Sequence, residues 1–92
     1  MTVLSDSDVD ARLADSAWQR AGDAIEREYK LADFAAAIAF VNRVAECAEQ
    51  ANHHPDIKLH GWNKVRLRLS THSEGGVTQA DLDMAARIDA SP

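Results

Sequence analysis

The chain has one cysteine, two prolines and no long run of apolar residues. A single thiol, Cys47, excludes an internal disulfide and any zinc site that needs several cysteines. No stretch approaches the roughly 20 apolar residues that span a bilayer. The first residues, MTVLSDSDVDA, have neither the basic start nor the apolar segment of a secretory signal. We therefore expect a cytoplasmic protein that does not enter a membrane.

Basic residues are too few to give the chain a positive charge. It contains 10 Lys and Arg against 15 Asp and Glu, a net charge of −5. This balance argues against sequence-independent binding to nucleic acid or to an anionic membrane, because both require a basic surface. With 92 residues, 46% of them hydrophobic, the chain fits a single globular domain over residues 1–92. Its core will be modest, and self-association would bury more surface.

The first 30 residues predict a short helix followed by a strand. Ser5 and Asp8 fit the capping box S-x-x-[DE], in which each side chain satisfies a free backbone N–H group. We expect a helix over about residues 6–15. The run 24–30, AIEREYK, follows a Gly-Asp pair and alternates imperfectly between apolar and polar residues, which favours a strand. Trp18 lies between these two elements and is expected in the core or in a hairpin.

Residues 34–51 carry the clearest helical pattern. Asp33 has the side chain of an N-cap residue, and the many alanines favour helix. Pro55 disfavours helical geometry at the residue before it, so the helix should end by Asn52 or His53. Apolar residues recur at helical spacing, which predicts one buried face formed by Phe34, Ala37, Ile38, Val41, Val44, Ala45 and Ala48.

After the internal proline the hydrophobic period changes from helical to two. Residues 57–60 alternate, and after a Gly-Trp-Asn turn the run 64–71 places one apolar set on a single face: Val65, Leu67, Leu69 and Thr71. Thr78 and Asp81 form a second capping box before a helix over about 79–88. The order is helix, strands, long helix, two strands, helix. This order predicts an α+β fold, with helices on an antiparallel sheet.

Three of the four histidines lie where these elements should end. His53 and His54 close the long helix, and His72 ends the last strand. Imidazole has an unperturbed pKa of about 6.5 and both donates and accepts protons near neutrality, so the three rings are candidates for acid–base catalysis. The alternative for each is an ordinary surface or capping residue. Glu49 lies four residues before His53, where its carboxylate would orient that ring or form a simple surface pair.

Other candidates have simpler interpretations. The three histidines and Glu49 offer ligands suited to zinc, but no H-E-x-x-H motif or cysteine pair sets the geometry, so we predict no metal site. Asp81 is accounted for by its helix cap. Trp62 is either a stacking platform for a flat heterocycle or, more simply, a hairpin anchor. Cys47 lies among apolar neighbours and favours packing over nucleophilic chemistry.

Together these residues resemble the signature of the pterin-4a-carbinolamine dehydratases. The segment 49–55, EQANHHP, is followed by Trp62, then by His72 and then by Asp81. Trp18 also falls where the family carries a tryptophan before its second strand. The similarity extends over nearly the whole chain, from about residue 4 to residue 88.

The resemblance implies a four-stranded antiparallel sheet with three helices on one face, in the order α-β-β-α-β-β-α. It also implies a homodimer or a larger assembly such as a homotetramer. The implied activity needs no cofactor: water is removed from a 4a-hydroxytetrahydropterin, the product of an aromatic amino acid hydroxylase, to give a quinonoid dihydropterin. Protonation of the leaving hydroxyl and loss of the N5 proton both suit imidazoles.

Carried over position by position, the resemblance makes His53 and His72 the acid–base residues and His54 a positioning residue that shares in proton transfer. The remaining site residues that it implies are Glu49, Trp62, Thr71 and Asp81. Glu49 and Asp81 would orient the imidazoles or contact the pterin. The residue before Asp81 is Ala80, where some members of the family carry an arginine. Any contact made by that arginine is therefore absent here.

Two alternatives stay open beside the enzyme. Some animal members of this family bind other proteins as dimerisation cofactors of a transcription regulator, so the resemblance also allows a non-catalytic interaction module. A small histidine-based metal protein is the third interpretation. The presence of all three motif histidines favours the enzyme.

Overall fold

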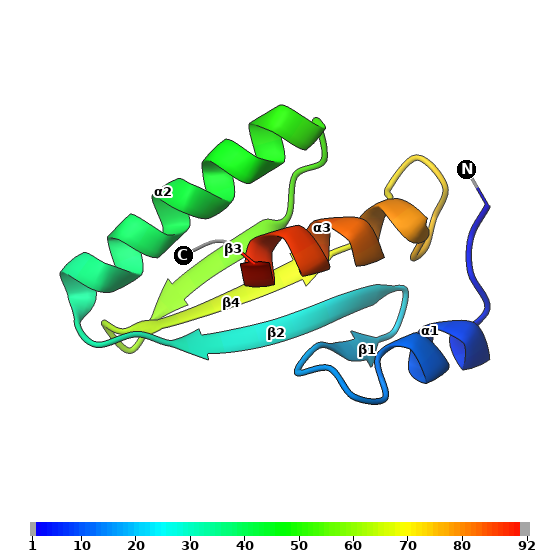
Figure 1. Cartoon of the computed structure of the whole chain (residues 1–92), viewed down its shortest axis with the longest axis horizontal. Helices are drawn as coiled ribbons and strands as arrows, with labels where there is room; N and C mark the ends of the chain where they lie inside the picture. The colour runs from blue at the N-terminus through cyan, green and yellow to red at the C-terminus, as the bar shows by residue number, and fades with distance from the viewer. Residues whose placement is uncertain (1, 91–92) are drawn as a thin grey trace.

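Seven elements alternate along the chain in a computed structural model that describes residues 2–90 (Figure 1). They are α1 (Asp6–Arg12), β1 (Gln19–Ala21), β2 (Ala24–Lys30), α2 (Phe34–Ala51), β3 (Asp56–His60), β4 (Lys64–Leu69) and α3 (Gln79–Ala90). The predicted α+β order is confirmed. Helix α1 ends three residues earlier than expected and α3 ends two residues later.

The predicted caps begin the helices. The Ser5 hydroxyl accepts a hydrogen bond of 3.1 Å from the Asp8 amide, and an Asp33 carboxylate oxygen accepts one of 2.8 Å from the Ala36 amide. Each side chain satisfies a backbone N–H group that has no partner within the helix. The start of α2 is therefore set by its local sequence.

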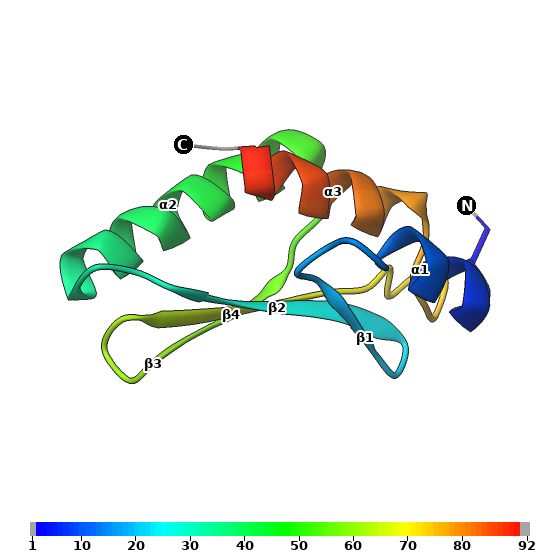
Figure 2. The same ribbon diagram turned by 60° about the horizontal axis from the view of Figure 1, so that its bottom comes forward.

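The four strands form one antiparallel sheet in the order β1-β2-β4-β3. Ile57 pairs with Leu67 across β3 and β4, and Ile25 pairs with Leu69 across β2 and β4. The three helices lie on one face of this sheet (Figure 2). The opposite face carries charged side chains, among them Glu26, which is bonded by arginines of β4.

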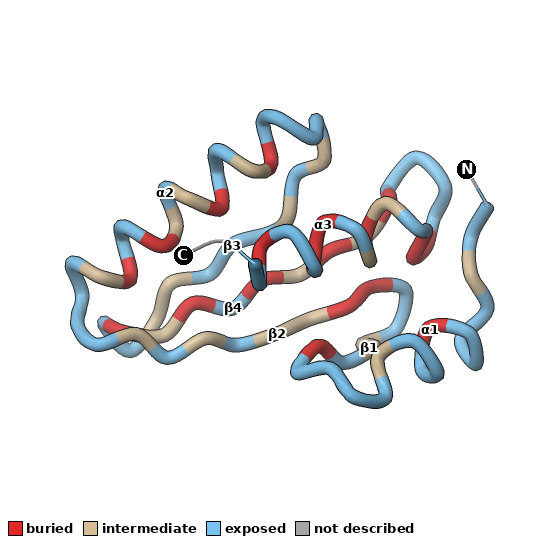
Figure 3. Tube along the Cα trace, in the orientation of Figure 1, coloured by how far each residue is buried: buried red, intermediate tan, exposed pale blue. Residues whose placement is uncertain are grey.

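The core lies between the helices and the sheet (Figure 3). Alternate residues of β4 point into it, and Val65, Leu67 and Leu69 are completely buried, as their period of two predicted. Trp18 is also buried, and its indole N–H donates a 2.9 Å hydrogen bond to Asp89 of α3. Residues from every layer therefore contribute to one core.

The buried face of α2 differs from the predicted one. Ala37, Val44 and Ala48 are buried as expected, but Phe34 and Ile38 are exposed and Phe40 takes a place in the core. The Phe40 ring lies 4.6 Å from that of Tyr29, centroid to centroid. Because the alanine-rich helix has apolar residues over much of its circumference, spacing alone did not distinguish the sheet-facing side.

Within residues 2–90, no helix is both long enough and apolar enough to cross a membrane. The same part of the chain contains no group of three or more His, Cys, Asp or Glu side chains placed to hold a metal ion.

Candidate functional site

The chain reverses direction immediately after α2, and this turn sets the positions of two histidines. Asn52 adopts the left-handed conformation with φ of 49°. The His53 amide bonds to the Ala48 carbonyl at 3.0 Å, and the Asn52 amide bonds to the Glu49 carbonyl at 3.3 Å. These two bonds form a Schellman motif, in which asparagine tolerates the left-handed position better than most residues. His53 therefore leaves the helix and turns toward α3.

His53 is held by a buried carboxylate. Its Nε2 lies 2.5 Å from Oδ1 of Asp81, whose side chain is 0% exposed. The other oxygen of Asp81 accepts 2.9 Å bonds from the Thr71 hydroxyl and from the Thr78 amide. When Asp81 is ionised, both of its oxygens accept hydrogen bonds, and Nε2 of His53 then carries a hydrogen. In the neutral ring Nδ1 is then the nitrogen that can accept a proton.

Thr71 and Thr78 complete this network. Their hydroxyl oxygens lie 2.7 Å apart, and because Thr71 donates to Asp81, Thr78 donates to Thr71. The bond from the Thr78 amide to Asp81 is part of the predicted helix cap, so one carboxylate both begins α3 and orients His53. Burial of Asp81 favours this orienting role over contact with a substrate. The cap interpretation taken from the sequence was correct but incomplete.

Glu49 is paired with His54 and not with His53. Its carboxylate lies 2.6 Å from Nε2 of His54, and both side chains are largely exposed. The expected pairing one helical turn apart does not occur because α2 ends at Ala51 and the left-handed residue redirects His53. Glu49 and His54 form instead a surface pair beside the buried one.

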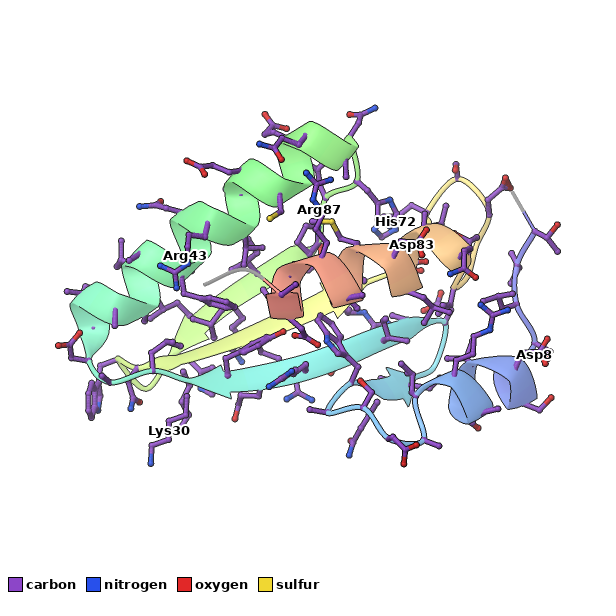
Figure 4. The ribbon with its side chains drawn as sticks, in the orientation of Figure 1. Asp8, Lys30, Arg43, His72, Asp83 and Arg87 are labelled. Carbon is purple, nitrogen blue, oxygen red and sulfur yellow. The ribbon has the colours of Figure 1, made fainter. Side chains whose placement is uncertain are left out.

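His72 lies at the same end of the sheet as the other two histidines. The register pairs Asp56 with Arg68, so residues that precede β3 and residues that follow β4 are neighbours. Thr71, bonded to Asp81, fixes the chain at the residue before His72. Figure 4 shows His72 between the segment that follows α2 and the first turn of α3. Its side chain is exposed.

Trp62 lies at the other end of the sheet. It belongs to the turn between β3 and β4, which is five strand residues, about 16 Å, from the histidine end. The side chain is 62% exposed, so it does not anchor the hairpin from within the core. The turn is fixed by Asn63, whose side chain donates a 3.1 Å bond to the Leu31 carbonyl. Within one chain, Trp62 is therefore apart from the histidines.

A hollow of about 200 Å³ opens beside His53, between the end of α2 and one face of α3. It is lined by Ala51, His53, Ala80, Asp83, Met84 and Arg87. Asp83 and Arg87 were not among the residues predicted from the sequence. The available signal was their spacing from Ala80, three and seven residues along the same helix, which places them on the face beside His53. A larger hollow of about 330 Å³ near α1 contains no histidine.

The chain matches the profile of a protein family described as "Pterin 4 alpha carbinolamine dehydratase" over residues 2–91. A protein of Roseiflexus sp. (strain RS-1) is 49% identical over 96% of this chain and 95% of its own length. A protein of Mycobacterium tuberculosis (strain H37Rv) is 50% identical over 98% and 96%. Both are named "Putative pterin-4-alpha-carbinolamine dehydratase".

Two solved structures share the fold. One, described as a transcriptional coactivator/pterin dehydratase from Brucella melitensis, is 36% identical, with a TM-score of 0.87 over 97% of both chains. The other is described as a pterin dehydratase-like protein that is a RuBisCO assembly factor in the alpha-carboxysome. It is 24% identical, with a TM-score of 0.65 over 79% of this chain and 83% of its own, so that likeness concerns the fold alone.

Proposed function

The chain belongs to the pterin 4 alpha carbinolamine dehydratase family, and from its site we propose that it removes water from a 4a-hydroxytetrahydropterin. The product is a quinonoid dihydropterin, and the reaction serves to recycle the tetrahydropterin used by aromatic amino acid hydroxylases. One observation carries this proposal: the His53 ring is fixed by the buried Asp81 carboxylate beside an open hollow. An oriented imidazole in such a place is suited to proton transfer.

The reaction breaks one C–O bond and forms one C=N bond. The hydroxyl on carbon 4a gains a proton and leaves as water, the N5 proton passes to a base, and the N5–H electron pair forms the C4a=N5 double bond. We assign these transfers to His53 and His72, with His54 positioning the substrate and sharing in the transfer. The bond from Nε2 of His53 to Asp81 leaves Nδ1 as its accepting nitrogen, which supports a role as base.

The other site residues act through these rings. Asp81 and Thr71 are buried in the hydrogen-bond network, so we assign them to the orientation of His53. Glu49 orients His54 at the surface. Trp62 would contact a pterin only if a second copy of the chain brought it to the site.

We expect the activity to require neither a metal nor a cofactor, because imidazoles alone supply both proton transfers. Dialysis against a chelator should therefore leave kcat unchanged. A fall that is restored by one metal ion would instead support the small metal protein considered above.

The decisive test is a dehydratase assay with five proteins. Wild type should accelerate the decay of a 4a-hydroxytetrahydropterin, and His53→Ala and His72→Ala should each lower kcat by roughly 10²-fold or more. His60→Ala is the matched control, because His60 bonds Glu28 on the open face of the sheet. Normal turnover in a His53→Ala, His72→Ala double variant would reject the assignment.

A protein-interaction module is the second candidate function. Several large apolar side chains are exposed on the surface. Among the described residues they are Val3, Phe34, Ile38, Ile57 and Trp62. Single exposed apolar residues are ordinary, but Phe34 and Ile38 lie one turn apart on α2. A stoichiometric partner on co-purification, together with no dehydratase activity, would favour this function.

The exposed Phe34 and Ile38 support our proposal that the chain forms a homodimer or homotetramer. We further propose that it works in the cytoplasm and, from its net charge of −5, that it binds neither nucleic acid nor an anionic membrane. Sedimentation equilibrium should give two or four times the monomer mass. The double variant Phe34→Ser, Ile38→Ser should shift the protein toward monomer if α2 forms the interface.

A further inference from the structure

The loop that carries His72 is closed at its base by backbone hydrogen bonds. This segment, the His72 loop, comprises residues 71–77 between β4 and α3. The Thr71 amide donates a 2.9 Å bond to the Gly76 carbonyl, and the Thr71 carbonyl accepts 3.0 Å bonds from the amides of Glu74 and Gly75. The His72 ring is exposed and not packed in the core, so its position depends on the loop.

The N-terminal segment lies against the returning side of the His72 loop (Figures 1 and 2). The Leu4 amide donates a 2.8 Å hydrogen bond to the Val77 carbonyl, and the Leu4 side chain packs against the core. The next residue, Ser5, caps α1, whose Val9 is buried. Val3 and Leu4 are thus held between α1 and a loop that is far from them in sequence.

Val3 approaches Gly76 too closely for a side chain to be present at that position. A Cβ atom added at Gly76 would lie 2.8 Å from Cγ1 of Val3, whereas carbon atoms in contact are about 3.5–4.0 Å apart. The backbone of Gly76 does not itself require glycine, because the positive φ in this loop belongs to Gly75, at 76°. The contact with Val3 is therefore the reason that position 76 needs a glycine.

Open space lies beside this contact. The hollow of about 330 Å³ near α1 is lined by Val3 and Leu4 and also by Gly75 and Gly76. A displaced Val3 side chain has room to enter this hollow. Loss of the contact should therefore release the loop without unfolding the core.

We propose that residues 3–4 form a strap that positions His72, an inference that rests on the function proposed above. The outgoing side of the loop is fixed where the Thr71 hydroxyl bonds Asp81. The strap fixes the returning side through its hydrogen bond and its van der Waals contact. With both sides held, the ring keeps its place relative to His53, and misplacement of a catalytic group by about 1 Å lowers a rate roughly 10²-fold. The strap residues are positioning residues with no part in proton transfer.

A double-mutant cycle on Val3 and Gly76 tests the strap. Gly76→Ala adds the Cβ atom that meets Val3 and should lower kcat roughly 10-fold, with KM within about 3-fold of wild type, because the strap acts on a proton-transfer group. Val3→Ala removes both Cγ atoms, adds none, and should lower kcat by only about 3-fold. In the double variant the two methyl groups have room for each other, so kcat should return to within about 3-fold of wild type. Thr2→Ala changes an exposed residue before the strap and is the matched control, expected to alter neither constant.

NMR spectra of the imidazole rings separate positioning from a general loss of stability. Gly76→Ala should shift or broaden the ring signals of His72, and the double variant should restore them. The signals of His60, which bonds Glu28 on the open face of the sheet, should stay unchanged in both variants. A purely structural role for the strap would lower the melting temperature without moving the His72 signals.

The outcomes also distinguish the strap from the reaction on which it rests. An active wild type with unchanged kcat or unchanged His72 signals in Gly76→Ala overturns the strap and leaves the dehydratase intact, as does a double variant no more active than Gly76→Ala. If wild type is inactive, the His72 signals alone decide between the strap and its absence. If Gly76→Ala does not fold, Val3→Ala decides: a shift of its His72 signals supports the strap, and unchanged signals overturn it.

Discussion

Three histidine–carboxylate pairs in this molecule have nearly the same length and different surroundings. His53 with Asp81, His54 with Glu49 and His60 with Glu28 have N–O separations of 2.5, 2.6 and 2.6 Å. In the first pair the side chains are 17% and 0% exposed; in the second they are 57% and 75% exposed, and in the third 36% and 38%. Of these three carboxylates, Asp81 alone also accepts bonds from a hydroxyl and from a backbone amide in the described part of the chain.

Distance alone does not distinguish the buried pair from the two surface pairs. An exposed ion pair contributes between nothing and about 1 kcal/mol, because water competes for both partners. A buried carboxylate has no water to replace a lost partner, so its hydrogen bonds fix it and the ring that it holds. Burial and the number of partners therefore separate the pair suited to chemistry from the two surface pairs.

The largest expected effect comes from breaking the buried pair. Asp81→Ala removes the acceptor of Thr71, the Thr78 amide and His53, and should lower the free energy of unfolding by about 3 kcal/mol. It should also lower kcat roughly 10²- to 10³-fold, because the His53 ring loses its orientation. Urea denaturation measures the first effect and the dehydratase assay the second. Glu49→Ala is the matched control and should change the stability by less than about 0.5 kcal/mol. Equal losses in the two variants would contradict the comparison.

Glu26 is a carboxylate of intermediate burial. Hydrogen bonds from Arg68 and then Arg66 lower the pKa of Glu26, partly offset by its burial. A lowered pKa in the folded state contributes stability above about pH 4.3, the ordinary pKa of glutamate, and this contribution is lost as the pH falls through the folded-state value. Glu26→Gln should thus cost about 1 kcal/mol at pH 7 and progressively less in acid. Thermal unfolding at pH 7, 4 and 3 tests this; a difference independent of pH would contradict it.

A smaller effect is expected for the exposed site pair. Glu49→Gln leaves His54 without its carboxylate partner, but water can replace a partner at the surface. We expect kcat to fall by no more than about 5-fold and the stability to change by a few tenths of a kcal/mol. A loss as large as that of Asp81→Ala would show that His54, and not His53, is the ring that carries the reaction.

The smallest effect is expected for the pair on the open face of the sheet. The hydrogen bond to His60 has the largest effect on the pKa of Glu28 and lowers it. Burial has the next largest effect and raises it. The Glu28 carboxylate is too exposed for its pKa shift to affect the stability of the fold. His60→Gln should therefore leave kcat and the melting temperature close to those of wild type. If His60→Gln lowered kcat as much as His53→Ala, the expectation that only the helix-covered face of the sheet carries the reaction would be wrong.

Local sequence predicted most of the fold. The caps at Ser5 and Asp33, the period of two in β4 and the proline after α2 each act within a few residues, so the helix and strand positions followed from them. The sheet-facing side of α2 did not follow, because it depends on which residues of the sheet lie beneath the helix. Phe40 rather than Phe34 meets Tyr29, and that contact joins two elements.

The candidate histidines could be named from the sequence, but their hydrogen-bond partners could not. Histidines at the ends of elements and the resemblance to a family identified His53, His54 and His72. The partner of His53 could not be found from helical spacing, because a single left-handed residue, Asn52, redirects the chain after α2. Asp81 is 28 residues away in sequence and meets His53 only in the folded chain.

The shared use of Asp81 links the start of α3 to the chemistry. The carboxylate that bonds the Thr78 amide is also the one that holds His53, so fraying of the first turn of α3 would release the ring while the sheet stayed folded. Loss of activity on warming should then precede loss of tertiary structure. We expect hydrogen exchange at the first amides of α3 to accelerate at the temperature at which activity is lost, while the rest of the fold is still intact.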